Sequence, residues 1–411
     1  MNFEFFTARR IIASKDYKSS VSAPIIKIAI AAIALGMVIM LVSIATGVGL
    51  QKKIREKVSA FNGDILISNF DSNNSNDSQA PISKNQDFYP EFKSVKGIKH
   101  IQVTASKGGI IRTATDFEGV VVKGVGADYD WQYFEEYLVA GRLPDYKGPL
   151  HDEVLISSYL ANRLSLQLGD KAVTFFLQEG NESKARSRGF TIVGIYDSGF
   201  EEFDEQFMLA DIRHIQKLNN WEDDQIGTFE LFVDDFDQIQ TIGNQVYDAT
   251  PSTLDVITVR DKYYAIFEWV DLFDFNIVLI IGIMILIAGI NMITALLVLI
   301  LERTQMIGIL KALGSTDWSV RKIFLYNAGY IICIGLFFGN VIGIGLLLLQ
   351  KYGKLITLDP KTYYVTEAPV YMGVGYIFLL NLGTLLLCLL MLLIPSYLVS
   401  KISPVKAIRF Q

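Results

Sequence analysis

Residues 275–301 read FNIVLIIGIMILIAGINMITALLVLIL, a run that contains no Asp, Glu, Lys or Arg. An apolar α-helix needs about 20 residues to cross a bilayer, so this run predicts a membrane-spanning helix. Three further runs have the same character and length: 28–50, 323–350 and 371–400. The sequence therefore predicts four transmembrane helices. The first of them is predicted to be an uncleaved anchor, because its apolar core is longer than that of a signal peptide.

The distribution of charge predicts how these helices are oriented. Residues 1–27, 302–322 and 401–411 together carry twelve Lys and Arg against four Asp and Glu, although the whole chain has a net charge of −6. Basic residues in short loops stay on the cytoplasmic side of a membrane. Both termini are therefore expected in the cytoplasm, and residues 51–274 are expected outside it.

Residues 51–274 form a large domain between the first and second helices. Runs such as GDILISNF (63–70), GVVVKGVG (119–126) and FTIVGIY (190–196) predict strands. The apolar spacing in 155–166 and 207–218 predicts helices, the second starting near Asp211. The fold class that follows is a four-helix membrane protein with a mixed α/β extracytoplasmic domain inserted between helices 1 and 2.

The composition of this domain limits its partners and its chemistry. It holds 22 basic and 37 acidic residues, which argues against binding to nucleic acid. It contains no cysteine, and the chain's two cysteines, Cys333 and Cys388, lie in predicted spans. The acidic run EEFDE (201–205) lacks the pattern of a calcium loop and is interpreted as a solvated turn.

The chain shows no sequence signature of an enzyme. There is no G-x-x-x-x-G-K-[ST] phosphate loop, no H-E-x-x-H and no G-x-S-x-G, and the three histidines are scattered. The spans carry no ionisable residue apart from tyrosines, which disfavours ion-coupled transport. Gly335, Gly339 and Gly343 share one helix face and predict close helix packing. We therefore expect no catalytic residue, no metal and no bound cofactor in this chain.

Five segments, in the same order along the chain, resemble segments of a known protein family. They are FTARRIIAS (6–14), EVLISSYLANRLSLQLGDKAVTF (153–175), FTIVGIYDSGFEEFDEQFMLAD (190–211), ERTQMIGILKALGST (302–316) and SPVKAIRF (403–410). Together they resemble ABC-transporter permeases of the MacB/FtsX superfamily, and most closely the lipoprotein-releasing permeases of the LolC/LolE type. The segment 190–211 is the most specific of the five.

The resemblance implies a transporter in the bacterial inner membrane, with the large domain in the periplasm. It implies a dimer with a second permease, the same or a homologous chain, on two copies of a separate ABC ATPase that binds ATP and Mg²⁺. The implied function is ATP-driven extraction of lipoproteins from the outer leaflet by mechanotransmission, with transfer to a periplasmic carrier. Membrane lipids are further partners.

These inferences together give a domain plan for the chain. It comprises a cytoplasmic N-terminal segment or interfacial helix (1–27), helix 1 (28–50), the periplasmic domain (51–274), helix 2 (275–301), a cytoplasmic coupling helix (302–322), helix 3 (323–350), a short periplasmic loop (351–370), helix 4 (371–400) and a cytoplasmic tail (401–411).

The coupling segment is the first candidate site. Apolar residues recur at helical spacing within it, and Gly314 suits a helix end. We expect this stripe to dock in a groove of the ATPase, with charged side chains at its rim. The residues concerned are Glu302, Arg303, Met306, Ile309, Leu310, Lys311, Leu313 and Gly314.

Two further candidate sites follow from the resemblance. A substrate cavity is expected at the outer ends of helices 1 and 2, lined by Ser43, Thr46, Val48, Leu50, Phe273, Phe275, Val278 and Leu279. A polar hairpin at 177–189 is expected to hold a carrier through Glu179, Glu182, Lys184, Arg186 and Arg188. The family's apolar hook residues do not map onto this hairpin, so its contact with a carrier would be electrostatic.

Two other functions remain open from the sequence. One is a MacB-like efflux permease for peptides or small molecules. The other is an FtsX-like regulator that activates a cell-wall hydrolase without transport, although residues 51–274 form a much larger domain than that of FtsX.

Overall fold

The computed structural model describes residues 3–13, 22–71, 79–176 and 186–402. The chain divides into two compact units. The helical unit comprises residues 1–51, 270–357 and 367–411, and the α/β unit comprises residues 52–269 and 358–366.

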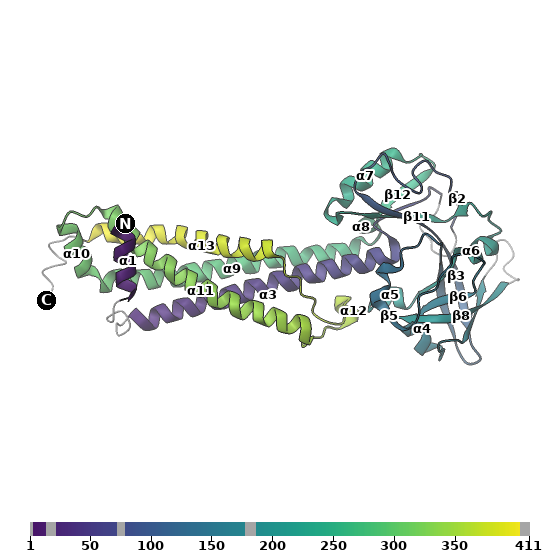
Figure 1. The fold of residues 1–411 in the computed structure, drawn as a ribbon, viewed down its shortest axis with the longest axis horizontal. Coiled ribbons are helices and arrows are strands. Elements are labelled where there is room, and N and C mark those ends of the chain that lie inside the picture. The colour runs from purple at the N-terminus through teal and green to yellow at the C-terminus, as the bar shows by residue number, and fades with distance from the viewer. Residues whose placement is uncertain (1–2, 14–21, 72–78, 177–185, 403–411) are drawn as a thin grey trace. The chain divides into compact units, whose positions relative to one another are not determined.

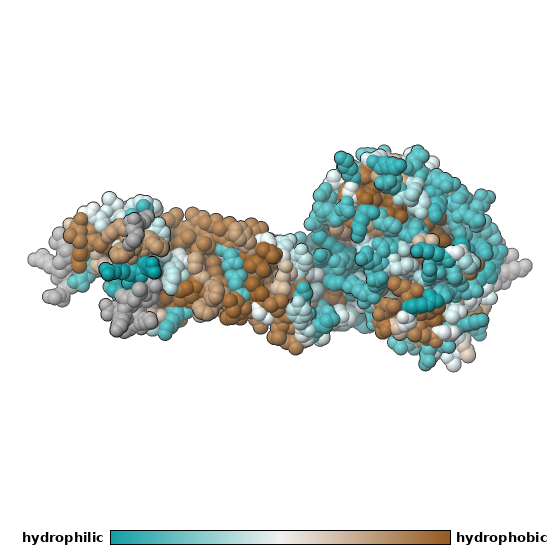
Figure 2. Space-filling view, in the orientation of Figure 1, coloured by the Kyte–Doolittle hydropathy of each residue, from teal (hydrophilic) through white to brown (hydrophobic). Residues whose placement is uncertain are grey.

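The helical unit confirms the four predicted spans. Four helices in the described part of the chain are long and apolar enough to cross a membrane. They belong to α3 (Ser22–Asn62), α9 (Tyr264–Glu302), α11 (Asp317–Gly353) and α13 (Val374–Ser396), and they are accompanied by α1 (Phe3–Ala13), α10 (Thr304–Ala312) and α14 (Leu398–Lys401). Three of the long helices extend beyond the predicted apolar runs, because a helix continues through charged residues where its backbone hydrogen bonds continue. Figure 2 shows apolar side chains over these helices.

Small residues bring α3 and α11 together, as the glycine spacing predicts. A Cβ added at Gly339 would lie 2.6 Å from the Cβ of Met37, and one at Gly335 would lie 2.8 Å from the Cβ of Ile33. Only glycine permits this approach of the two backbones. Asn340 on α11 and Asn381 on α13 exchange hydrogen bonds of 2.7 and 3.0 Å, so these two amides join a second pair of helices.

The α/β unit is built on a mixed ten-stranded sheet with the order β12-β1-β11-β3-β4-β9-β6-β8-β5, in which β7 pairs with β3 and β8. The strands are β1 (Ile65–Asn69), β3 (Ile98–Arg112), β4 (Phe117–Val125), β5 (Leu138–Gly141), β6 (Glu153–Ser157), β7 (Lys171–Phe176), β8 (Arg186–Tyr196), β9 (Phe207–Asp211), β11 (Thr228–Val233) and β12 (Leu254–Thr258). A small second sheet pairs β2 (Ile82–Ser83) with β10 (Gln225–Ile226).

The helices of this unit are short. They are α4 (Ser158–Arg163), α5 (Glu201–Asp204), α6 (Ile212–Asn219), α7 (Ile239–Ala249), α8 (Val259–Lys262) and α12 (Pro360–Tyr363), with 3₁₀ turns at Trp131–Tyr133, Glu135–Tyr137 and Phe236–Gln238 (Figure 1). Two predicted helices begin later than expected, because 153–157 and 207–211 are buried strands. The helix start at Asp211 is confirmed, since its side chain accepts a hydrogen bond from the backbone amide of Arg213.

Candidate functional site

The predicted coupling helix corresponds to α10, which is separated from α9 by an interruption of the helix at Arg303. Its last turn is closed by a hydrogen bond of 3.0 Å from the Ser315 amide to the Leu310 carbonyl. Gly314 adopts φ +92°, a conformation that L side chains seldom adopt. Thr316 then caps α11 by accepting a hydrogen bond from the Ser319 amide. The helix end predicted at Gly314 thus lies just after α10, and α11 begins at Asp317.

The apolar residues of α10 do not form one exposed stripe. Met306 and Leu310 pack against the buried core of the helical unit, next to fully buried Ile307. Ile309 and Leu313 are 47% and 79% exposed. The predicted stripe is therefore divided, and only its outer half is free to meet another protein.

Lys311 does not lie at the rim of a docking surface. Its side chain is 8% exposed, and its Nζ donates to the carbonyls of Ser400 and Ile402 at 3.1 and 3.0 Å. The same Nζ lies 2.8 Å from Oδ1 of Asp317. The prediction that Lys311 lies at the rim of the docking surface was wrong, because its side chain is bound by the carbonyls of Ser400 in α14 and of Ile402 just after it. Lys311 joins α10 to the end of α14.

The two other charged residues of the predicted rim differ in exposure. Glu302 is exposed at the end of α9, and Arg303 is partly buried. The Nε of Arg303 is buried and has no hydrogen-bond partner within the described residues. Gly314 is exposed in the turn that follows α10, and as a glycine it adds no side chain to that surface.

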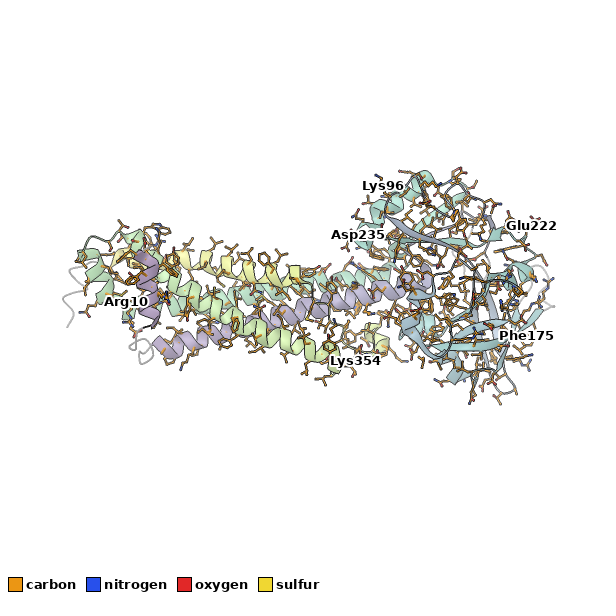
Figure 3. All side chains as sticks on the ribbon, viewed as in Figure 1. Arg10, Lys96, Phe175, Glu222, Asp235 and Lys354 are labelled. Atoms are coloured by element: carbon orange, nitrogen blue, oxygen red, sulfur yellow. The ribbon has the colours of Figure 1, made fainter. Side chains whose placement is uncertain are left out.

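The N-terminal helix α1 is held against the start of α11. Ser319 Oγ donates to Oε1 of Glu4 at 2.8 Å, and Lys322 Nζ lies 3.7 Å from the same oxygen. The pKa of Glu4 is lowered, first by a backbone hydrogen bond and then by the one from Ser319. Phe3, Phe5 and Phe6 are exposed, as Arg10 also is (Figure 3). This pattern suits a helix lying at a membrane surface.

The predicted cavity residues lie on two helices that pack together, since a Cβ at Gly47 of α3 would lie 2.5 Å from Ile277 of α9. Those on α3 face mainly inward, since Leu50 is buried and Val48 packs against the core. Ser43 and Thr46 are partly buried, and Thr46 Oγ1 donates to the Val42 carbonyl at 2.7 Å. Those on α9 face outward: Phe275, Val278 and Leu279 are exposed, and Phe273 is partly buried. The free apolar surface is therefore mostly on α9.

The predicted carrier hairpin is described only at its root. Glu179, Glu182 and Lys184 lie outside the described residues. Arg186 Nη1 donates to the Leu218 carbonyl and to Asn220 Oδ1 at 3.3 and 3.2 Å, which satisfies the end of α6. Arg188 donates to the Ser187 carbonyl at 3.2 Å.

An apolar surface beside this root was not predicted from the sequence. Ile110, Phe117 and Val173 are exposed, and Phe175 is paired with Ile110 across β7 and β3. Figure 3 labels Phe175 on this strand. The alternation of β7, KAVTFF, gives a signal for such a face, because Lys171, Val173 and Phe175 point to the same side.

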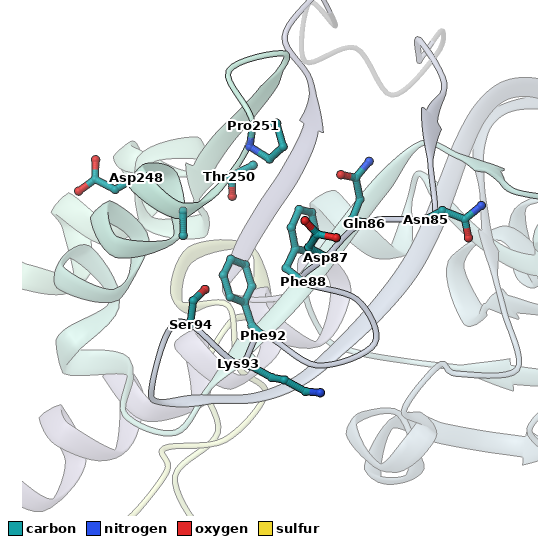
Figure 4. A pocket seen from close by; sticks show the side chains of 11 residues that line it. Asn85, Gln86, Asp87, Phe88, Phe92, Lys93, Ser94, Asp248, Thr250 and Pro251 are labelled. Atoms are coloured by element: carbon teal, nitrogen blue, oxygen red, sulfur yellow. The ribbon is translucent and has the colours of Figure 1, made fainter.

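A groove of about 590 Å³ lies elsewhere in the α/β unit, between the 85–94 segment and the end of α7 (Figure 4). Phe88 and Phe92 stack at its floor with ring centroids 5.1 Å apart. Asp87, Lys93 and Asp248 contribute charges of both signs. No group of three or more His, Cys, Asp or Glu side chains in the described residues is arranged to hold a metal ion.

Lys123 and Glu230 form a buried ion pair in the α/β unit. Lys123 Nζ lies 2.6 Å from Oε1 of Glu230, and both side chains are buried. Glu230 also accepts hydrogen bonds from Gln102 and Thr104 at 2.9 and 3.1 Å. These contacts satisfy the pair, which joins β4 to β11 across the intervening strand β3.

Asp204 corrects the interpretation of EEFDE as a solvated turn. Phe203 and Asp204 are buried in α5, and Ser198 Oγ donates to Oδ1 of Asp204 at 2.7 Å. Burial raises the pKa of Asp204 to about 6, against the opposing effect of the Ser198 hydrogen bond.

These features define a class of protein: a four-span membrane protein with a large α/β domain after its first span and a short helix between its second and third. The MacB-like periplasmic core domain matches residues 28–249, more than half of the chain, and the FtsX-like permease C-terminal domain matches residues 278–404. The chain belongs to the MacB/FtsX family of ABC-transporter permeases.

Several named proteins are similar to it along most of their length. The lipoprotein-releasing system transmembrane protein LolC of Neisseria meningitidis is 24% identical over 93% of this chain and 94% of its own. LolE of Haemophilus influenzae is 21% identical over 99% of both chains. The solved periplasmic region of MacB from Actinobacillus actinomycetemcomitans is 12% identical over 50% of this chain and 92% of its own, with a TM-score of 0.32.

Proposed function

We propose that this chain is the permease subunit of an ABC transporter that releases lipoproteins from the inner membrane. The observation that carries this proposal is the similarity to LolC over 93% of the chain. The four apolar helices and the inserted α/β domain agree with that role. Both termini face the cytoplasm in this proposal, because the basic residues lie in 1–27, 302–322 and 401–411.

The energy enters through α10. The chain carries no phosphate loop, so ATP and Mg²⁺ belong to a partner ATPase, present in two copies beneath two permease chains. Ile309 and Leu313 are the exposed apolar residues of α10 and dock on that ATPase. Lys311 holds α10 to the end of α14, so a displacement of α10 also reaches the fourth span.

The substrate is held at the outer end of α9. Phe275, Val278 and Leu279 offer exposed apolar surface to the acyl chains of a lipoprotein. Moving an acyl chain out of the membrane costs about 0.8 kcal/mol for each CH₂ group, which requires coupling to ATP or an apolar path. A periplasmic carrier would receive the chains at the apolar surface of Ile110, Phe117 and Val173.

A photo-crosslinking experiment tests the substrate. A photoreactive amino acid replaces Val278, which is 68% exposed on α9, in full-length protein co-expressed with its ATPase. The matched control replaces Phe378, which is 64% exposed on α13. We expect a covalent adduct with triacylated lipoprotein at position 278 only.

Other outcomes would support the rival functions. Adducts with secreted peptides alone would indicate efflux, and adducts with a cell-wall hydrolase on the α/β unit without any lipoprotein would indicate a regulator. Equal labelling of lipoprotein at positions 278 and 378 would show that lipoproteins in the membrane contact both helices alike. That result would contradict a substrate site on α9.

A further inference from the structure

The connection between α11 and α13 is fixed at its base by its own residues. Gln350 Nε2 donates to the carbonyls of Ile356 and Ala368 at 3.1 and 3.2 Å, and its Oε1 accepts from the Ile356 amide at 2.9 Å. Thr357 and Glu367 form an antiparallel bridge between the two arms of the connection. These contacts close the base of the connection into a loop that belongs to the helical unit.

The tip of the connection, residues 358–366, packs in the α/β unit and is called the clasp below. The ring of Tyr364 stacks on that of Phe200, with centroids 4.6 Å apart and planes 18° apart. Lys57 Nζ donates to the Tyr364 carbonyl at 3.1 Å, and Lys361 Nζ lies 2.6 Å from Oε1 of Glu201. The clasp is held by an aromatic contact, a hydrogen bond and an ion pair.

Tyr364 ends α12 in a left-handed backbone conformation, in which its amide donates to the Pro360 carbonyl at 2.9 Å. Its φ is +59°, in the left-handed region that residues other than glycine seldom adopt. Such a conformation persists where the surrounding contacts hold it. Trp269 also meets the Tyr364 ring edge-on, with centroids 5.6 Å apart.

The contact at Tyr364 continues as a column of stacked rings. Phe200 stacks on Phe203 with centroids 4.6 Å apart, and Phe203 stacks on Phe61 with centroids 4.8 Å apart. All three phenylalanines are buried. Phe61 is the penultimate residue of α3, the helix that contains the first span. The aromatic column, Tyr364–Phe200–Phe203–Phe61, therefore runs from the clasp to the end of α3.

We propose that the clasp and the aromatic column join the third and fourth spans to the C-terminal end of α3, as a second connection between the spans and the α/β unit. A close-packed interior transmits displacement, since it has little free volume to absorb it. Along the chain, α3 and α9 run directly into the α/β unit, whereas α11 and α13 are joined to that unit by the segment 358–366. The role of the clasp in transport rests on the function proposed above, whereas the contacts that hold the clasp in the α/β unit do not depend on that function.

Hydrogen exchange of the full-length chain in lipid nanodiscs tests the clasp without ATPase or substrate. We expect Tyr364→Ala to speed amide exchange in residues 198–205 and 58–62 by roughly tenfold, through loss of the first ring of the column. Tyr363→Ala is the matched control, because Tyr363 is the neighbouring tyrosine and lies outside the stack. Exchange in 198–205 that is the same in Tyr364→Ala and wild type would overturn the proposal.

A charge swap gives a second test should Tyr364→Ala misfold. Lys361→Glu should speed exchange across 358–366 by roughly twofold to fivefold, as expected for loss of an exposed ion pair. Adding Glu201→Lys should restore it, and a failure of that rescue would contradict the docking.

In ATP-driven release assays Tyr364→Ala should lose most activity. A wild type that releases no lipoprotein would count against the proposed function, while the exchange data would still decide the clasp.

Discussion

Asp204 shows how a single carboxylate differs from its neighbours in an acidic run. Glu201 is partly exposed and Glu202 is exposed, whereas Asp204 is buried. Its carboxylate accepts a hydrogen bond from the Ser198 hydroxyl, and its carbonyl accepts one from the Ser157 hydroxyl. Sequence spacing cannot identify which acid is buried, because one partner, Ser157, lies 47 residues away in the sequence. Lys311 was misassigned for the same reason, since its acceptors are Ser400 and Ile402.

The raised pKa of Asp204 makes the stability of the α/β unit depend on pH. Its pKa rises from 3.8 to about 6 on folding, so the folded state binds the proton more tightly and stability falls as the pH rises from about 4 to 6. Asp204→Asn keeps an acceptor for Ser198 and should raise the free energy of unfolding by about 1–3 kcal/mol at pH 7.5.

Unfolding of the full chain in detergent, followed by tryptophan fluorescence from pH 3.5 to 7.5, measures this effect. The two proteins should converge near pH 4, and exposed Glu202→Gln serves as the control. Curves for Asp204→Asn and wild type that stay parallel over this range would show that Asp204 is not protonated on folding.

Among the elements, the membrane helices were predicted best. Long uncharged runs and the glycine spacing of 335, 339 and 343 give strong signals, and both were confirmed. Prediction was poorer in the α/β unit, where the fifteen-residue strand β3 was missed and 155–166 was assigned to one helix. Short buried runs such as VLIS suit strand or helix equally, and the partner strand decides between them. The aromatic column also escaped prediction, since its rings come from three separate segments.

The divided surface of α10 determines which variant tests its docking. Leu313→Asp places a charge on a residue that is mostly exposed, so it should weaken ATPase binding roughly tenfold or more and leave folding intact. Leu310→Asp would instead disturb the core of the helical unit. Leu355→Asp, an exposed leucine of the α11–α13 connection, is the control. Binding to the purified ATPase in detergent is the measurement, and equal affinity for Leu313→Asp and wild type would refute docking through α10.

At the scale of the whole molecule, the sequence was sufficient to identify the family and the arrangement of four spans around an inserted domain. Five motifs in order carried that identification, and the matches over residues 28–249 and 278–404 confirm it. The candidate sites were predicted less well. The coupling residues were predicted from helical spacing and the cavity residues from the resemblance to the family. Neither signal shows packing within the folded chain, which buries Leu50 and the Lys311 side chain and packs Met306 and Leu310 against the core.

The central claim, that this permease uses the energy of a partner ATPase to release lipoproteins, is tested most directly by reconstitution. Liposomes would contain the full-length chain, its partner ATPase, a homologous permease and a labelled triacylated lipoprotein, with a periplasmic carrier in solution. We expect the lipoprotein to appear on the soluble carrier when ATP and Mg²⁺ are added, and to stay in the liposomes with a non-hydrolysable ATP analogue. Continued ATP hydrolysis with no lipoprotein leaving the membrane would contradict it.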